Sequence, residues 1–241
     1  MTSSSSTVPV YMQHWWIWFA VAFLVTFVSF WPSFFSAMSN AATHILIHGL
    51  SATAWMLLAV IQAVLIRSRW RKHHRKLGYV SFGLAAVVVV SGLLVLKTMM
   101  LGGSQRDGFT LAMKFFYIDL TALGLFCVFL GLAIKAARLR DIGLHLRLIA
   151  CTAILPLEAV LERTYVYGIP SLVPNLDVSL IASEVTLIVL TAGLVAGEWW
   201  YQRLRWPFAV MLIYYILMLL TQDLMAGADW FIALALGYAE L

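Results

Sequence analysis

The fold of this chain is decided by residues 43–76, THILIHGLSATAWMLLAVIQAVLIRSRWRKHHRK, in which a long apolar run ends in a basic cluster. The run covers residues 43–66. At ~1.5 Å per residue, a helix of this length crosses the ~30 Å hydrocarbon core of a bilayer. The basic cluster is typical of a short loop on the cytoplasmic side. The stretch therefore predicts a transmembrane helix followed by a cytoplasmic turn.

The composition of the whole chain agrees with this prediction. Of its 241 residues, 63% are hydrophobic and 11% are charged, whereas an ordinary soluble domain is about half apolar and about a quarter charged. The formal net charge is +5, but most Lys and Arg residues lie in short loops between apolar runs, which favours a topology signal over nucleic-acid binding. The two cysteines, Cys127 and Cys151, provide neither a disulfide framework nor a CxxC metal site.

Seven apolar runs are long enough to cross a bilayer as helices: residues 15–36, 43–66, 78–101, 110–134, 146–167, 178–200 and 207–226. Helices are required because lipid offers no partner to an unpaired backbone group, and the runs lack the alternation of barrel strands. The predicted fold is all-α, an integral membrane bundle of seven transmembrane helices formed by residues 15–241 as one domain. Residues 1–14 are predicted to be a disordered polar tail, and residues 229–241 are too short to span.

The loops predict how the bundle is oriented. Those between runs two and three, four and five, and six and seven, together with Arg147 at the start of the fifth run, carry twelve of the sixteen Lys and Arg residues, and the other loops are nearly neutral. Basic loops stay in the cytoplasm, so the N-terminus is predicted to be cytoplasmic and the C-terminus outside. Pro156 is predicted to kink the fifth helix and to free a backbone carbonyl.

Ionisable residues inside the runs gather in the predicted outer half. Charges in a membrane are costly unless they face the bundle interior, so we expect these residues to line one outer cavity. Two pairs, His44 with His48 and Glu158 with Glu162, have i, i+4 spacing and each share a helix face. The predicted metal ligands are His44, His48, Asp119, Glu158, Glu162 and Glu184, with Lys97, Lys114, Tyr117 and Arg163 as supporting residues.

The charge balance of this cavity leaves its ligand open. Together with Asp223, the carboxylates outnumber the three cations by two. A divalent transition metal such as zinc, iron or copper, protons on buried carboxyls, or a cationic substrate would each balance the site. Salt bridges within a solvated vestibule are the simpler alternative.

A second candidate site lies at the predicted cytoplasmic surface. His74 and His145 begin neighbouring helices and are candidate ligands of one b-type haem, with Arg75 and Arg147 as partners of its propionates. The alternative is that this basic surface binds anionic lipid headgroups.

The stretch around the second run also carries a resemblance. With His48, Trp55, Gln62, and the sequence His74-Arg75-x-Leu77-Gly78, it is similar to an uncharacterised family of bacterial multi-pass membrane proteins. Later positions similar to this family are His145, Arg147, Arg163 and Glu184. A more distant likeness to cytochrome b561 rests on His48 and His74. The resemblance implies the bacterial inner membrane as the location.

These observations leave three hypotheses for function. The first is a metal- or haem-binding protein of membrane redox chemistry or of respiratory-complex maturation. The second is a proton-coupled transporter of small solutes, with Asp119, Glu158 and Glu184 as proton carriers. The third is an accessory subunit without chemistry in a larger membrane complex. The lipid bilayer, and with it other membrane subunits, are the expected partners, and nucleic acid is not.

Overall fold

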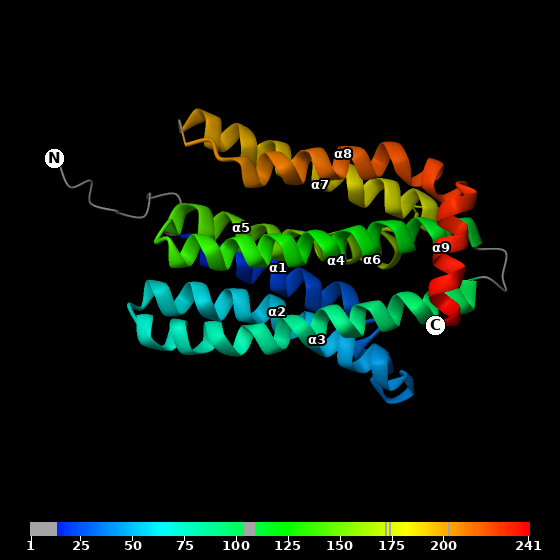
Figure 1. Cartoon of the computed structure of the whole chain (residues 1–241), viewed down its shortest axis with the longest axis horizontal. Helices are drawn as coiled ribbons and strands as arrows, with labels where there is room; N and C mark the ends of the chain where they lie inside the picture. The colour runs from blue at the N-terminus through cyan, green and yellow to red at the C-terminus, as the bar shows by residue number, and fades with distance from the viewer. Residues whose placement is uncertain (1–13, 104–108, 172, 174, 202) are drawn as a thin grey trace.

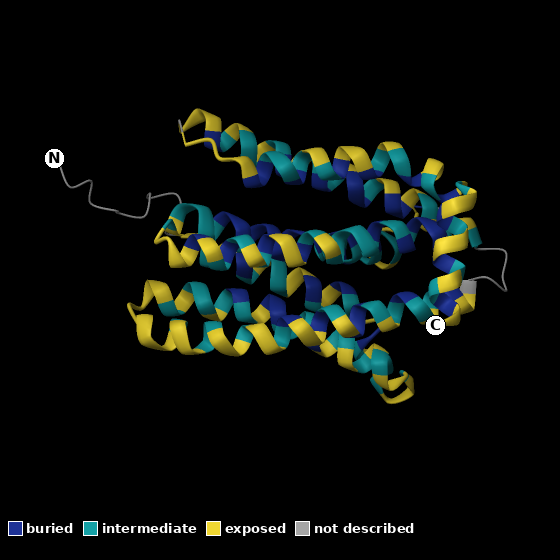
Figure 2. Ribbon diagram, in the orientation of Figure 1, coloured by how far each residue is buried: buried dark blue, intermediate teal, exposed yellow. Residues whose placement is uncertain are grey.

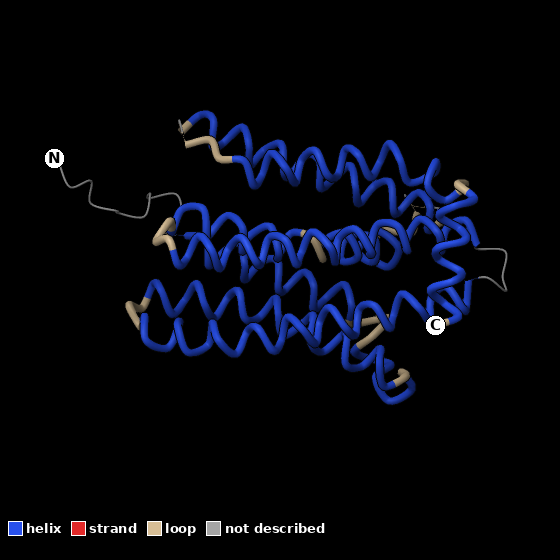
Figure 3. Tube along the Cα trace, in the orientation of Figure 1, coloured by secondary structure: helices blue, strands red, loops and turns tan. Residues whose placement is uncertain are grey.

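A computed structural model describes residues 14–241 except 104–108, 172, 174 and 202, and every regular element among them is helical (Figures 1 and 3). The predicted disordered tail, residues 1–14, lies almost wholly outside the described residues. The elements are α1 (Trp15–Phe30), the 3-10 helix η2 (Phe35–Asn40), α2 (Thr43–Arg67), α3 (Arg71–Gly103), α4 (Phe109–Arg138), α5 (Ile142–Ile154), α6 (Leu157–Gly168), α7 (Leu176–Trp200), α8 (Trp206–Ala226) and α9 (Asp229–Glu240).

The all-α prediction is confirmed for the described residues, and so are most of the predicted spans. Six segments are long and apolar enough to cross a membrane, namely α2, α3, α4, α5 with α6, α7 and α8, and α1 is a shorter apolar helix. The first predicted run, 15–36, is wrong at its end, since α1 stops at Phe30. Pro32 has no backbone N–H to continue the helix, and the chain turns there before η2.

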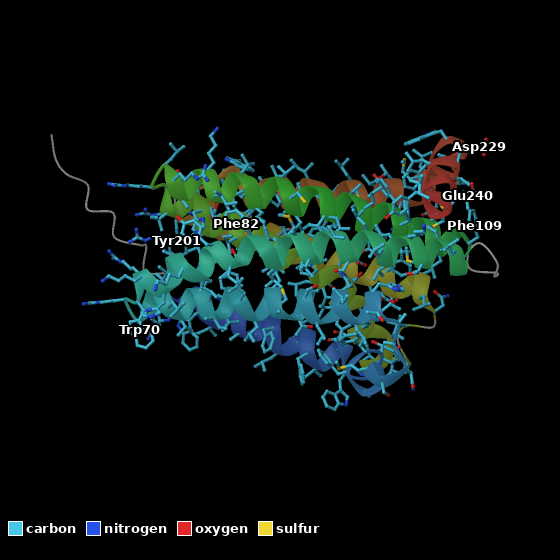
Figure 4. The ribbon with its side chains drawn as sticks, turned by 60° about the horizontal axis from the view of Figure 1, so that its bottom comes forward. Trp70, Phe82, Phe109, Tyr201, Asp229 and Glu240 are labelled. Carbon is cyan, nitrogen blue, oxygen red and sulfur yellow. The ribbon has the colours of Figure 1, made fainter. Side chains whose placement is uncertain are left out.

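The long helices lie side by side in antiparallel pairs (Figure 1). α2 pairs with α3, α4 with α5, and α7 with α8, while α1 packs on α2 and α6, and α6 packs on α7. Three turns, at residues 68–70, at residues 139–141 and between α7 and α8, meet at one end of the bundle together with the start of α1. We call this the basic end, because it carries the basic loops. In Figure 4, Trp70 and Tyr201 lie at this end, and Phe109 and Asp229 lie at the other, the α9 end.

The predicted kink at Pro156 is confirmed as a break between α5 and α6. α5 ends at Ile154 and α6 begins at Leu157. The break releases the Ile154 carbonyl, which accepts a hydrogen bond from the Tyr215 hydroxyl of α8 at 3.3 Å. Glu158 therefore lies in the first turn of α6, where the free N–H groups and the dipole of a helix favour negative charge.

α9 gives residues 229–241 a defined place. It runs across the α9 end of the bundle and packs on α3, α4 and α8 (Figure 1). Its own residues Phe231, Ala235 and Ala239 are buried against the bundle, and the Tyr238 hydroxyl donates to the Leu93 carbonyl at 2.7 Å. This segment is thus a helical cap over one end of the bundle.

The bundle has an apolar core and an apolar outer surface. Buried residues run along the faces that the helices turn to each other, and exposed residues run along the outward faces (Figure 2). Many of the exposed residues are large and apolar, for example Val90, Val189 and Leu220 at 58%, 67% and 70% exposure. A surface of this kind is stable in contact with lipid and not in water.

Candidate functional site

Three glutamates are buried between α6 and α7. Glu158 and Glu162 on α6 are 4% and 6% exposed, and Glu184 on α7 is 0% exposed. Glu158 is ten residues from Gly168 at the end of α6, or roughly 15 Å from that helix end at 1.5 Å per residue. That depth is close to the middle of a ~30 Å hydrocarbon core. Glu158 is therefore the deepest of the three, whereas Glu162 is six residues from Gly168, or roughly 9 Å from that helix end.

Glu158 is the centre of the group. The charged residues that act on it electrostatically come from α4, α6 and α7: Asp119, Glu162, Glu184 and Arg163. Its Oε1 accepts a hydrogen bond from the Ser183 hydroxyl at 3.2 Å. Four of the predicted residues are thus brought together. We call Asp119, Glu158, Glu162 and Glu184 the carboxyl cluster.

One cation belongs directly to the carboxyl cluster. Arg163 donates from one guanidinium nitrogen to Glu162 Oε2 and to the Ala159 carbonyl, both at 3.0 Å. Its guanidinium carbon lies 4.4 Å from the centre of the Phe30 ring on α1. Arg163 is 32% exposed at its side chain. Glu162 is therefore the ion-paired member of the cluster.

Glu184 has a neutral partner. The Gln222 amide on α8, which is 1% exposed, donates to Glu184 Oε2 at 2.7 Å. The other oxygens of this pair, Glu184 Oε1 and Gln222 Oε1, are buried and have no hydrogen-bond partner among the described residues. The pair is thus deeply buried, and no hydrogen-bond donor among the described residues reaches its two remaining oxygens.

Lys114 links the cluster to the α9 end. Its ammonium group lies 2.6 Å from carboxylate oxygens of both Asp177 and Asp223. The lysine side chain is 6% exposed, whereas those of the two aspartates are 49% and 74% exposed. These three residues also act electrostatically on Glu184. Nearby, the Tyr117 hydroxyl on α4 lies 3.0 Å from Thr221 Oγ1 on α8.

The histidines of the predicted cavity face α3. His44 Nε2 lies 3.1 Å from Thr98 Oγ1, and His48 Nδ1 lies 3.2 Å from Ser91 Oγ. A shallow apolar groove of about 370 Å³ runs along α2 and α3 beside His44. Neither histidine is among the groups that act electrostatically on Glu158.

The structure therefore does not join the predicted His and carboxylate ligands in one site. Among the described residues, no group of three or more His, Cys, Asp and Glu side chains is arranged to hold a metal ion. Lys97 on α3 is partly buried. A metal centre built from these residues stays a prediction.

A second polar network ties the basic end together. Arg147 on α5 and Glu198 on α7 form a buried ion pair, with 2% and 4% exposure. Arg147 also donates to the Gly143 carbonyl at 2.8 Å and to the Arg203 carbonyl at 3.4 Å. Glu198 Oε2 accepts the backbone N–H of Arg205 at 3.0 Å. Arg147, predicted as a haem propionate partner, is here a partner of Glu198.

Asp141 extends this network to the surface. Its carboxylate lies 2.6 Å from the guanidinium of Arg205 and caps α5 by accepting the Leu144 N–H at 3.0 Å. The hydrogen bond from Arg205 is the main reason that the pKa of Asp141 is lowered from its usual value. The turns after α4 and after α7 are thereby held to each other.

The two candidate haem ligands lie close enough to interact electrostatically. His145 Nδ1 lies 2.9 Å from the Ala133 carbonyl, and the His74 ring is near the backbone of Gln62. His74 Nδ1 and Gln62 Oε1 are buried without a hydrogen-bond partner among the described residues. Arg75 is exposed.

Several contributors to these sites were not predicted as site residues. Glu198 precedes Trp199 and Trp200 at the end of an apolar run. A single carboxylate at this position is a signal in the sequence that could have predicted an ion pair with Arg147. Gln222 and Ser183 have no distinctive sequence spacing, and only the packing of α7 against α6 and α8 shows their role.

No protein-family model, curated protein or solved structure matches this chain. The likeness to an uncharacterised bacterial family and to cytochrome b561 stays a prediction. The chemistry of the chain's own side chains is therefore the basis on which a function is assigned.

Proposed function

We propose that this membrane protein moves protons through the carboxyl cluster and couples that movement to a small solute. The observation that carries the proposal is the burial of three glutamates in the apolar helices of the bundle, with Glu158 electrostatically coupled to the other two and to Asp119. Ionisable groups are costly in a bilayer and mark proton and substrate pathways when they occur there.

The charge balance supports protons as the mobile species. Lys114 is occupied by two aspartates at the α9 end, and Arg163 is occupied by Glu162. Asp119, Glu158 and Glu184 then share no hydrogen-bonded cation among the described residues. Several ionised carboxylates at this depth would repel each other, and proton binding removes that repulsion.

The arrangement along the bundle gives the pathway a direction. Exposed Asp177 and Asp223 lie at the α9 end, and Lys114, which pairs with both, also acts electrostatically on Glu184. On the other side of the cluster, the apolar core includes fully buried Leu148, Leu187 and Met211. We infer access from the α9 end and closure toward the basic end, for which the basic loops favour the cytoplasmic side. The inner membrane of a bacterium is the location that this proposal assumes.

Proteoliposomes that contain a pH-sensitive dye test the proposal. A potassium diffusion potential drives protons inward while a panel of small solutes is added outside. We expect solute-dependent acidification in the wild type, and its loss in Glu158→Gln and Glu184→Gln. Glu240→Gln, at an exposed position on α9, is the matched control and retains it. Acidification of equal rate in all four proteins would refute the proposal.

A haem at the basic end is a second candidate, favoured by the proximity of His74 and His145. The bond from His145 Nδ1 to the Ala133 carbonyl is the contact that orients a metal-binding imidazole and leaves Nε2 available. A bound haem would supply one-electron chemistry. A reduced-minus-oxidised absorption spectrum of the purified protein tests this, and a folded sample without a haem band rejects it.

A further inference from the structure

Glu184 and Gln222 form a pair at the contact of α7 and α8. They are 0% and 1% exposed, and the Gln222 amide nitrogen donates to Glu184 Oε2 at 2.7 Å. The remaining oxygens, Glu184 Oε1 and Gln222 Oε1, are buried and have no hydrogen-bond partner among the described residues. Each member of the pair thus contributes one unused acceptor.

A single proton satisfies both acceptors. An ionised carboxylate only accepts hydrogen bonds, whereas a neutral carboxyl has one O–H donor and keeps an acceptor. Buried polar atoms in native proteins almost always have partners. With a proton on Oε1, Glu184 donates to Gln222 Oε1 while its Oε2 still accepts from Gln222 Nε2. An acid and a primary amide are complementary in this way through two parallel hydrogen bonds.

We propose that Glu184 and Gln222 form a proton-holding site, in which Glu184 is a neutral carboxyl in this conformation and Gln222 positions its proton. This inference deepens the proposed function. It rests on the proposed function only for the role of the bound proton in transport. Gln222 is here a positioning residue, because it acts through Glu184.

The surroundings of the pair favour the neutral form. Ionisable groups reach it from each helix packed around it: Glu158 on α6, Lys114 on α4, Asp177 on α7, and Asp223 and Tyr215 on α8. Lys114 is the only cation among them, and it is already bonded to both aspartates. Glu158 is a second acid, whose negative charge would oppose one on Glu184.

Infrared spectroscopy of the full chain in detergent or lipid tests the inference. A protonated carboxyl has its own carbonyl stretching band, which shifts on deuterium exchange. We expect such a band at neutral pH that is lost in Glu184→Gln. Glu162→Gln is the matched control, because Glu162 is paired with Arg163 and should contribute no such band. Gln222→Leu should shift the Glu184 band to higher frequency, since both hydrogen bonds are lost.

A stability measurement adds a readout that does not depend on spectra. In Glu184→Gln the new amide has nearly the same shape as a neutral carboxyl and makes the same two bonds, so the unfolding midpoint should be unchanged. If Glu184→Gln fails to fold, the band shift in Gln222→Leu still tests the proposal. The absence of a protonated-carboxyl band from the wild type, or its retention unchanged in both variants, overturns the inference.

The two proposals can fail separately. A Glu184 band without proton movement in proteoliposomes supports the proton-holding site and refutes the transport function. Proton movement that requires Glu184, in a protein without that band, supports transport and overturns the neutral Glu184.

Discussion

Removing the carboxylate of Glu198 tests the buried ion pair at the basic end. In Glu198→Ala, Arg147 stays at 2% exposure and loses its carboxylate partner. Removing one partner of a buried ion pair costs about 3–5 kcal/mol. Arg147 keeps its bonds to the carbonyls of Gly143 and Arg203, so we expect the lower part of that range. The Arg205 N–H that Glu198 accepts lies at an exposed residue, where water can replace the carboxylate.

Two companion variants separate charge from packing. Glu198→Gln retains an acceptor for the Arg205 N–H and should be less destabilised than Glu198→Ala. The double variant Arg147→Met with Glu198→Leu replaces the pair by apolar groups of similar size, which is often neutral or stabilising. The free energies of unfolding should therefore be strongly non-additive in a double-mutant cycle.

The chain contains its own reporter for this measurement. Cys151 lies one turn after Arg147 on α5 and is 0% exposed, whereas Cys127 is exposed. In a Cys127→Ser background, a thiol reagent reports only the opening of the protein around Cys151. A loss of 3 kcal/mol corresponds to a rise in labelling rate of roughly 100-fold. A rate in Glu198→Ala that stays within about threefold of the parent, or a double variant as labile as the single one, would refute the reasoning.

Three further perturbations have expected outcomes. Gly49→Ala places a Cβ 2.3 Å from the Phe34 ring, so we expect the free energy of unfolding to fall by about 1–3 kcal/mol from overpacking. The control Gly124→Ala meets nothing within 4 Å and should not destabilise the fold. Thermal unfolding in detergent compares the two variants. The lowered pKa of Asp141 stabilises the fold above the ordinary aspartate pKa, and this stability is lost as the pH falls through the lowered value. Asp141→Asn, which retains an acceptor for the α5 cap, should abolish that acid dependence, and an unchanged profile of unfolding midpoint against pH would contradict the assignment. Tyr215→Phe removes the donor to the Ile154 carbonyl and should cost about 0.5–1.5 kcal/mol, measurable by the same unfolding assay.

Much of the fold follows from the sequence because the bilayer restricts the possibilities. Each apolar run must form a helix, and the break at Pro156 follows from the missing N–H of proline. The end of α1 and the path of α9 are harder to predict from the sequence. Pro32 lies inside an apolar run without a change in hydropathy, and α9 is too short to be recognised by length, so its place depends on packing against α3 and α4.

The candidate site was predictable only in part. Burial costs predict that Asp119, Glu158 and Glu184 turn toward one another, and the structure places them so. The same argument is silent on which helices are neighbours. His48 lies in the same predicted outer half, but α2 packs on α3, so its ring bonds Ser91 and does not join the carboxyl cluster. The position of a residue in its helix determines its depth in the membrane, whereas the packing order of the helices determines which side chains are its neighbours.

The interruption between Ile154 and Leu157 also divides this span into two halves that pack against different helices. α5 is attached mainly to α4, and it carries Arg147 at the basic end. α6 is attached mainly to α1 and α7, and it carries Glu158 and Glu162. Because the helix is interrupted there, each half of this span takes its direction from its own neighbours. The placement of the buried acids on α6 is therefore set by α1 and α7, and that of Arg147 on α5 by α4.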